Sequence, residues 1–279
     1  TLLQRVGNSE VRVKLYCVDP SNRLAIAFDR LSGVVCFSAT LQPTRYFKAL
    51  LGIDNSAHWQ ELPNPYPREK LHVAMATYVD TSFSGRESSI EALIELIDAV
   101  ISSRPGGYLV FFPSYSYLDA TYETFAAKYP DTPVVTQKPK MTDKERQEFL
   151  EHFDGDVVCG FAVMGGIFGE GVDLKGRRLI GTIIIGVGLP GLSVDRDLIR
   201  DRYAEDGFKF AYQYPGFTRV LQAAGRVIRS EKDEGVVCLV DSRYAEIGYQ
   251  KLFPSQWQPH KVLSATSLRQ SLADFWVGR

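Results

Sequence analysis

The stretch Tyr108-Leu109-Val110-Phe111-Phe112-Pro113-Ser114-Tyr115-Ser116-Tyr117 decides the fold of this chain. Its first five residues form a continuous apolar run, which is typical of a strand buried on both faces of a sheet. Ser114 then stands where a helix cap is expected, directly before the helical pattern over 115–128. A buried strand that turns straight into a helix is the repeating unit of a parallel α/β sheet, and we predict that fold.

The same alternation of strands and helices extends along most of the chain. Besides 108–112, we expect strands at 11–17, 34–37, 71–76, 133–136, 157–161, 180–186 and 236–240. We expect helices at 43–51, 87–102, 115–128, 143–153, 195–210, 217–228 and 267–276. The prediction is an α/β fold with a mostly parallel sheet that helices cover on both faces.

Composition narrows the classes of protein. The 279 residues are 45% hydrophobic and 23% charged, which is ordinary for a globular protein. A net charge of −1 gives no overall attraction for nucleic acid, so any strand-binding surface must be a local patch. The chain has no apolar run of membrane-spanning length, no signal-peptide pattern and no initiator Met. We expect a cytoplasmic, nucleoid-associated bacterial protein, represented here by a fragment.

The four cysteines are not spaced as metal ligands, and each follows or lies within an apolar run. We therefore predict buried free thiols in a reducing compartment and no metal site. The cysteines are Cys17, Cys36, Cys159 and Cys238.

Three prolines at alternate positions in Leu62-Pro63-Asn64-Pro65-Tyr66-Pro67-Arg68 predict an extended linker. The predicted organisation is a small N-terminal portion at 1–62, a linker at 63–70, a main α/β domain at 71–258 and a C-terminal tail at 259–279.

Hydroxyl side chains follow two of the expected strands. Ser38-Ala39-Thr40 comes after 34–37, and Ser114-Tyr115 comes after 108–112. Ligands of open parallel sheets bind where strands end, and a helix N-terminus suits a phosphodiester. In isolation, a plain helix cap is the better explanation for Ser38-Ala39-Thr40, and the two explanations are balanced for Ser114-Tyr115.

Two further segments follow strands. The glycine-rich loop Gly165–Leu174 contains Glu170, Gly171 and Asp173, and its backbone can approach a ligand closely. No Gly-Lys-Ser/Thr follows, so this loop is not a P-loop, and positioning is favoured over general-base work for the two carboxylates. Asp241 and Arg243 end the strand at 236–240, where a salt bridge or helix cap is the plainer interpretation.

The stretch Gln222-Ala223-Ala224-Gly225-Arg226-Val227-Ile228-Arg229 contains the most informative charges. Arg226 and Arg229 are three apart and are expected on one face of the helix predicted at 217–228. Planar guanidinium groups in this arrangement suit a polyphosphate. Gly225 leaves room for another surface to approach. Without context, a solvent-exposed arginine pair is the commoner explanation.

Together and in this order, the segments resemble the C-terminal half of the XPD/DinG family of superfamily 2 DNA helicases, over nearly the whole chain. Gln222 to Ser230 followed by Asp233-x-Gly235 is the most specific part. The resemblance implies a RecA-like lobe of the P-loop NTPase type, preceded by a small portion of the first motor lobe. It also implies 5′-to-3′ movement on DNA.

The same resemblance implies roles for single residues. Arg226 and Arg229 match the arginine fingers that stabilise charge on the transferred γ-phosphoryl group. Residues implied near the nucleotide are Gln222, Gly225, Glu170, Gly171 and Asp173. Residues implied in DNA contact, or in coupling DNA grip to the ATP state, are Ser38, Thr40, Ser114 and Tyr115.

The chain lacks a Gly-x-x-x-x-Gly-Lys-Ser/Thr loop and an Asp-Glu-x-His box. By resemblance, ATP and Mg²⁺ are bound mainly by the absent first lobe, and an iron–sulfur cluster is possible only in that absent N-terminal part. We expect the isolated chain to be inactive as an ATP hydrolase. Its expected partners are single-stranded or forked DNA and the first lobe of the same polypeptide, with no membrane.

Two alternatives remain open at this point. One is a non-catalytic nucleic-acid-binding or regulatory module derived from a helicase lobe, which has no use for γ-phosphate fingers. The other is an unrelated α/β enzyme, although the four histidines are scattered and form no Ser/Cys–His–acid series. A Walker-type loop upstream in the gene would favour the motor over the module.

Overall fold

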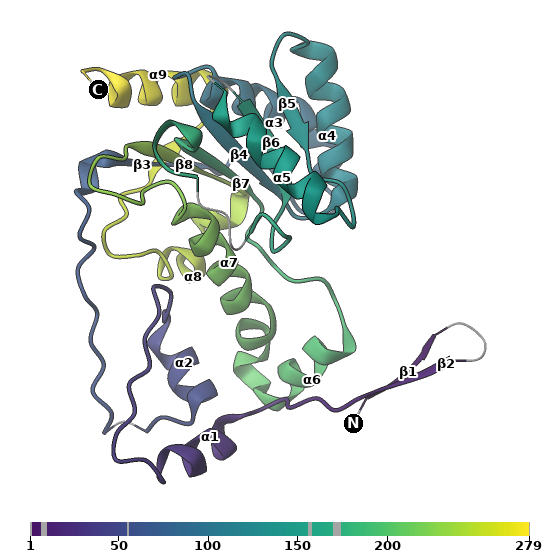
Figure 1. Cartoon of the computed structure of the whole chain (residues 1–279), viewed down its shortest axis with the longest axis vertical. Helices are drawn as coiled ribbons and strands as arrows, with labels where there is room; N and C mark the ends of the chain where they lie inside the picture. Colours follow the sequence, from purple (N-terminus) through teal and green to yellow (C-terminus); the bar gives the residue numbers. More distant parts are fainter. Residues whose placement is uncertain (1, 7–9, 55, 156–157, 170–173, 279) are drawn as a thin grey trace. The chain divides into compact units, whose positions relative to one another are not determined.

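The computed structural model describes residues 2–6, 10–54, 56–155, 158–169 and 174–278. Contacts within the chain divide it into two compact units, both drawn in Figure 1. Unit 1 consists of Thr1–Glu61 and Pro190–Pro215, and unit 2 of Leu62–Leu189 and Gly216–Arg279. Which motor lobe each part belongs to stays a prediction.

Unit 2 is built on a seven-stranded sheet in the order β5-β6-β4-β7-β8-β3-β9. All of its neighbouring strands run parallel, and every residue of β4 and β8 is buried. The predicted parallel α/β sheet is therefore confirmed. The strands are β3 (Leu71–Ala76), β4 (Gly107–Phe112), β5 (Val134–Thr136), β6 (Val158–Val163), β7 (Gly181–Ile185), β8 (Gly235–Val240) and β9 (His260–Val262).

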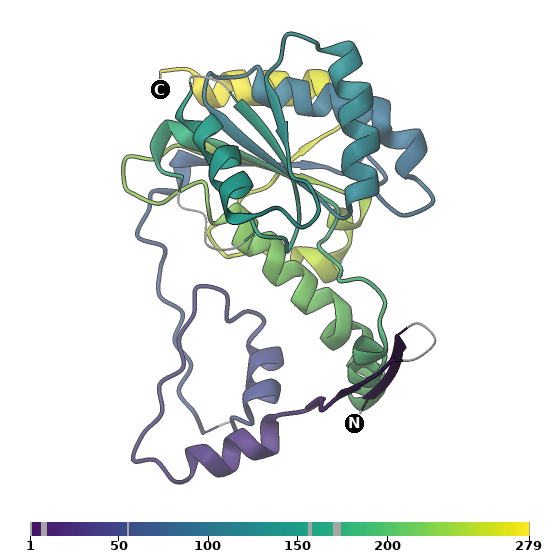
Figure 2. The same ribbon diagram turned by 45° about the vertical axis from the view of Figure 1, so that its right-hand side comes forward.

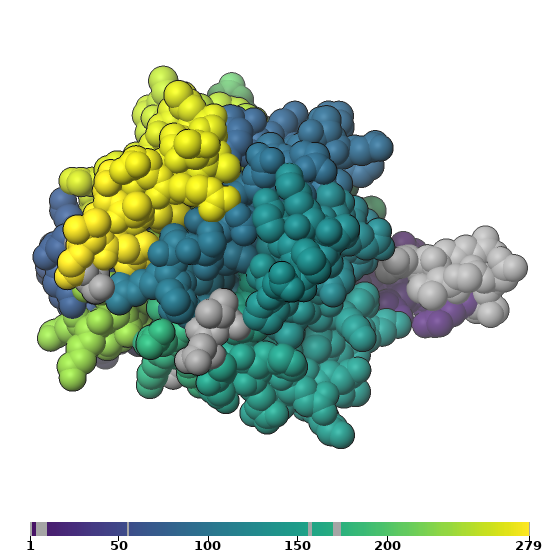
Figure 3. All heavy atoms as spheres, turned by 90° about the horizontal axis from the view of Figure 1, so that it is seen from above, coloured from purple at the N-terminus to yellow at the C-terminus, as the bar shows by residue number. Residues whose placement is uncertain are grey.

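Three helices lie side by side on one face of this sheet, as Figures 1 and 3 show. They are α3 (Arg86–Ile101), α4 (Tyr115–Lys128) and α9 (Ala265–Trp276). Apolar side chains from all three helices join one buried core with the strands, and Leu93 and Phe125 in it are completely buried. β9 and α9 thus extend the sheet and its helical layer within the segment predicted as a tail.

The opposite face carries α5 (Asp143–Glu151), which Figure 2 shows in front of the sheet. Successive residues of a strand point to opposite faces. Phe161 of β6 contacts Phe125 of α4, whereas a side chain at neighbouring Gly160 would meet the ring of Phe149 on α5. Both faces are covered, as predicted. The remaining helices are α7 (Tyr214–Ala224) and α8 (Ile247–Gln250).

Unit 1 has less regular structure. An antiparallel hairpin joins β1 (Leu2–Val6) to β2 (Glu10–Lys14), and the sequence did not predict β1. Its described α-helices are α1 (Ser21–Phe28), α2 (Thr44–Leu51) and α6 (Val194–Arg202), and none of the three has a buried residue, whereas a π-helix over Lys209–Gln213 buries Phe210 and Tyr212.

Aromatic contacts and ion pairs connect the two chain segments of unit 1. Tyr46 of α2 contacts Phe210 at 5.1 Å between ring centroids, and within the second segment Tyr203 stacks on the same Phe210 ring at 4.0 Å. Arg202 lies 2.7 Å from Asp19. The segment Pro190–Pro215 therefore packs with the N-terminal 61 residues rather than with the sheet that precedes it in sequence.

The strand expected at 34–37 is wrong. These residues are irregular, with Val35 exposed at 85% and Phe37 at 90%. A strand needs a neighbour to satisfy its backbone hydrogen bonds, and β1 and β2 pair only with each other among the described strands of unit 1. The apolar pattern predicted a strand, but no described strand of unit 1 pairs with these residues.

Two predicted helices end several residues before their expected limits. The one at 217–228 ends at Ala224, and the N–H groups of Arg226 and Val227 that follow bond three residues back, to Ala223 and Ala224, in a tighter turn. The one at 195–210 ends at Arg202 and is followed by a turn with Ala204 at φ +44° and a π-helix over Lys209–Gln213.

The predicted burial of the cysteines is half right. Cys159 and Cys238 lie buried in β6 and β8, and desolvation raises the pKa of the Cys238 thiol to about 12. Cys17 and Cys36 are exposed, because the strands expected around them end earlier or do not form.

Candidate nucleotide and nucleic-acid site

Ser114 and Tyr115 lie where β4 ends and α4 begins in unit 2. The Ser114 hydroxyl accepts the Tyr117 N–H at 3.4 Å, which confirms the predicted helix cap. The Tyr115 hydroxyl accepts a hydrogen bond from Gln137 Nε2 at 2.9 Å, and Gln137 Oε1 accepts the Val163 N–H at 2.8 Å. Desolvation raises the Tyr115 pKa. Gln137, which sequence reasoning missed, thus links the ends of β4, β5 and β6.

The glycine-rich loop begins at the end of β6. Gly165 has φ +73°, a left-handed conformation that favours glycine. Phe168 is completely buried and stacks on Phe149 of α5 at 4.1 Å. The predicted positions Glu170, Gly171 and Asp173 lie outside the described residues.

The two arginines do not share a helix face. α7 ends at Ala224, Gly225 and Arg226 form a turn, and Arg229 lies in the irregular segment beyond. Arg226 is only 6% exposed, and its guanidinium group donates to the backbone oxygen of Gly169. Arg229 is exposed. The structure therefore brings Arg226 to the glycine-rich loop and leaves Arg229 at the surface.

The segment that carries Arg229 has a fixed backbone. The Asp233 carboxylate, 8% exposed, accepts the Arg229 N–H at 2.8 Å and the Ser230 N–H at 2.7 Å. From the proline-rich segment, the Tyr66 hydroxyl donates to the Arg229 backbone oxygen at 2.9 Å, and Lys70 Nζ donates to the Glu231 oxygen at 2.6 Å. Sequence reasoning treated Tyr66 as part of a plain linker, because no local pattern reveals a contact 163 residues away.

Gln222 lies half-buried on the last turn of α7. Gly225 is exposed, and a side chain added there would first meet the Leu221 oxygen of the same helix at 3.2 Å.

Ser38 and Thr40 belong to unit 1, in an exposed turn. The Ser38 hydroxyl accepts the Thr40 N–H at 3.2 Å and lies 3.4 Å from the Thr40 hydroxyl.

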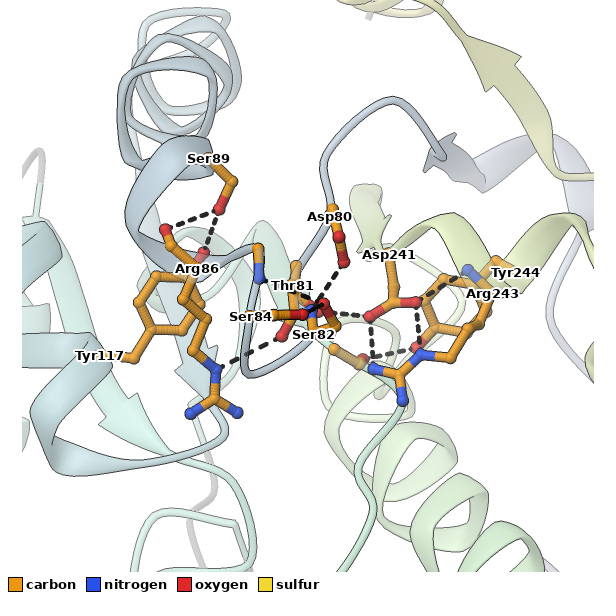
Figure 4. Close-up of polar contacts among 12 residues, drawn as sticks. Asp80, Thr81, Ser82, Ser84, Arg86, Ser89, Tyr117, Asp241, Arg243 and Tyr244 are labelled. Atoms are coloured by element: carbon orange, nitrogen blue, oxygen red, sulfur yellow. Dashed lines mark hydrogen bonds and ion pairs between the residues drawn. The ribbon is translucent and has the colours of Figure 1, made fainter.

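The pair at the end of β8 is a salt bridge, which confirms the plainer interpretation. Arg243 binds Asp241 through two nitrogens at 2.8 and 2.7 Å, and the Asp241 carboxylate also accepts the Arg243 N–H and the Thr81 hydroxyl. Figure 4 shows this cluster between the residues that follow β3 and β8. Its hydrogen bonds raise the pKa of the Arg243 guanidinium.

Across the part of the chain that the structure describes, no three or more His, Cys, Asp or Glu side chains are grouped to bind a metal ion. In that same part, every helix is too short or too polar to cross a bilayer.

Comparison with known proteins supports the resemblance. Residues 97–260, more than half of the chain, match the family model described as the helicase C-terminal domain. A probable ATP-dependent helicase of Methanocaldococcus jannaschii is 28% identical over 233 residues, covering 76% of this chain and 35% of that protein. A regulator of telomere elongation helicase 1 homolog of Caenorhabditis elegans is 27% identical over 286 residues, covering 88% of this chain and 28% of that protein.

Among solved structures, an XPD helicase superposes with a TM-score of 0.65 at 18% identity, covering 88% of this chain and 45% of that one. This likeness shows that the fold is shared and confirms the predicted RecA-like lobe. The chain spans about a third of the length of the curated relatives it matches.

Proposed function

Because the chain belongs to the family of helicase C-terminal domains, we propose that it is the second motor lobe of an ATP-dependent DNA helicase. The observation that carries the proposal is the hydrogen bond from Arg226 to Gly169. It joins the arginine segment to the glycine-rich loop, so a ligand bound at one alters the position of the other. Such a connection is what a motor needs to convert a nucleotide state into a change in strand binding.

The two arginines have different parts in this proposal. Arg229 is exposed, and bonds from Asp233 and Tyr66 fix its backbone. It is suited to stabilise negative charge on a phosphoryl group presented by another lobe, without reorganising its own main chain. To bind a phosphate, Arg226 must replace its hydrogen bond to Gly169 with one to the phosphate. Loss of the Gly169 bond would couple the nucleotide state to the position of the glycine-rich loop.

Strand contacts are assigned to Ser114 and Tyr115, which follow β4 at the carboxyl edge of the sheet. Gln137 orients the Tyr115 ring by binding its hydroxyl group, so the ring can meet a base without a loss of rotational freedom. Ser38 and Thr40 are assigned to coupling, and 5′-to-3′ movement follows from the resemblance.

ATP and Mg²⁺ are assigned mainly to the first lobe. The described residues include no metal-binding group of His, Cys, Asp and Glu, and they do not by themselves fit a magnesium or iron–sulfur site. When bound, Mg²⁺ would neutralise phosphate charge. This chain's contribution is the positioned guanidinium groups.

The test is made in the full-length enzyme. Arg229→Ala and Arg226→Ala should each lower DNA-stimulated ATP turnover by about 10³-fold or more and leave DNA affinity within a few-fold of wild type. Arg229→Lys should restore little, since a point charge does not replace a planar fork. Arg177→Ala removes an exposed arginine elsewhere on unit 2 and serves as control. Near-normal turnover in both arginine variants would exclude the finger assignment and favour the non-catalytic module.

A second measurement addresses the isolated chain. It should hydrolyse ATP negligibly, with or without single-stranded DNA. Robust activity would contradict the assignment as half of a motor and would favour an independent α/β enzyme.

A further inference from the structure

A small cavity lies at the carboxyl edge of the sheet in unit 2, apart from every residue assigned above. Its volume is about 160 Å³, and its walls come from the segments that follow β3, β4, β7 and β8. These four strands are neighbours in the sheet. Open parallel sheets bind ligands at this edge, where the ends of several strands converge.

The charged side chains that line the cavity are two arginines. Arg243 is paired with Asp241, whereas Arg86 donates only its Nε, to the Thr81 backbone oxygen at 3.4 Å. Figure 4 shows the two terminal nitrogens of Arg86 pointing away from Thr81. No carboxylate lies within 4.0 Å of Arg86 among the described residues, so its charge has no direct ion-pair partner there, whereas Asp241 pairs with Arg243 and the Asp80 carboxylate accepts the Ser82 N–H. An anion is the ligand that this charge favours.

The size of the cavity limits the anion. A volume of about 160 Å³ far exceeds the ~30 Å³ of a water molecule and is below the ~300 Å³ at which pockets for whole cofactors begin. Gly186 and Gly188, with φ +83° and +71°, contribute backbone without side chains to one wall. A phosphate group with part of its sugar has the required size, and a complete nucleotide does not.

An exposed aromatic ring favours a nucleic-acid strand over a free phosphate as the ligand of this cavity. Phe83 lines the cavity and is 90% exposed, with the Arg86 guanidinium 5.7 Å from its ring centroid. A free phosphate has no use for this ring, whereas the base next to a bound phosphodiester can stack on it. The lining residue Pro113 directly precedes Ser114 and Tyr115, so one nucleic-acid strand can reach both the cavity and these two residues.

We propose that this cavity binds one phosphodiester of a single nucleic-acid strand, with Arg86 contacting the phosphate and Phe83 stacking on the adjoining base. Arg243, paired with Asp241, lines the same cavity. The proposal rests on the proposed function, because it adds a contact for the same strand.

The experiment measures binding of two fluorescein-labelled 20-mers to the 279-residue chain over a series of salt concentrations. One probe is oligo(dT), and the other is an abasic sugar–phosphate chain of equal length. Arg86→Gln should weaken both probes about 5- to 10-fold and reduce the slope of log K against log salt by about 1. Phe83→Ala should weaken oligo(dT) at least about 5-fold and leave the abasic probe unchanged.

Controls separate the site from general charge and from misfolding. Arg177→Gln removes the same charge from an exposed position and should stay within about 2-fold of wild type. Arg86→Lys should recover part of the affinity, and the melting temperature of each variant reports its fold.

Three results would overturn the proposal. The first is unchanged affinity in Arg86→Gln and Phe83→Ala while wild type binds oligo(dT), which leaves the motor assignment intact. The second is an equal loss in Arg177→Gln. The third is Arg86-dependent binding of inorganic phosphate while Arg86→Gln leaves the affinity for oligo(dT) unchanged, which would identify a free anion as the ligand. If wild-type chain binds neither 20-mer, the strand-binding part of the proposed function fails as well.

Discussion

The two units of this chain use their apolar residues differently. In unit 2, strands β4 and β8 are buried along their whole length, and helices cover both faces of the sheet. In unit 1, helices α1, α2 and α6 have no buried residue, and Leu15, Val35 and Phe37 are at least 85% exposed. Unit 2 therefore contains its own core, whereas unit 1 relies on a few aromatic contacts and ion pairs.

This difference fits the proposed function. Unit 2 buries both faces of its parallel sheet against its own helices. An apolar segment such as 34–37 needs a neighbouring strand to be buried, and the first motor lobe is the neighbour that the proposal supplies. The contrast teaches that a strand-like sequence forms a strand only where the fold supplies a neighbour to pair with it.

The largest expected effect tests this contrast directly. Phe161→Ala removes a completely buried ring that contacts Phe112 and Phe125, and it should lower the free energy of unfolding by about 3–5 kcal/mol. Phe37→Ala, at a ring 90% exposed, should change it by less than about 0.5 kcal/mol. Urea titrations followed by circular dichroism measure both. Equal losses would mean that unit 1 buries Phe37 after all.

The next effect depends on pH and concerns the edge of the unit 2 sheet. His72 of β3 is 7% exposed, stacks on His260 at 4.9 Å, and lies 3.1 Å from the Ser271 hydroxyl. Desolvation, assisted by His260, lowers the His72 pKa to about 4. The unfolded chain therefore binds a proton at higher pH than the folded chain does.

The contribution of neutral His72 to the free energy of unfolding should be fully present above about pH 6.5. It should decrease as the pH falls toward 4, by up to about 3 kcal/mol. Urea midpoints between pH 4 and 7.5 measure this, and His72→Phe should flatten the curve in that window. An unchanged curve in the variant would assign the pH dependence to other groups.

A smaller effect is expected in the arginine segment. Asp233→Ala removes the acceptor of the Arg229 and Ser230 N–H groups and should cost about 1–3 kcal/mol of stability. In the full-length enzyme it should also lower ATP turnover, because the Arg229 backbone loses its support. Loss of stability with normal turnover would separate Asp233 from the proposed finger.

The smallest effect compares a helix cap in unit 2 with a turn hydroxyl in unit 1, where the N-cap of α2 is Pro43 and not Ser38. Ser114→Ala should cost about 1 kcal/mol, because its hydroxyl accepts the Tyr117 N–H at the start of α4. Ser38→Ala, in an exposed turn of unit 1, should cost less than about 0.5 kcal/mol. Differential scanning calorimetry of the two variants resolves this. A larger loss at Ser38 would place that turn in a packed environment.

Much of unit 2 could be predicted from the sequence, because its signals are local. The strands at 71–76, 108–112 and 236–240 appear within one residue of their predicted limits, and α4 covers 115–128 as predicted. Continuous apolar runs and the Ser114 cap act over a few residues, so a single sequence contains them completely. The order of the motifs was likewise enough to identify the helicase family.

Only the tertiary structure decided the contacts between distant residues. It ended α7 at Ala224, joined Arg226 to Gly169, and placed Tyr66 against the Arg229 backbone. It also left 34–37 without a partner strand and brought Phe83, Arg86 and Arg243 to one cavity. Hydrogen bonds and burial of this kind depend on which residues the fold brings together, and sequence periodicity carries no information about them.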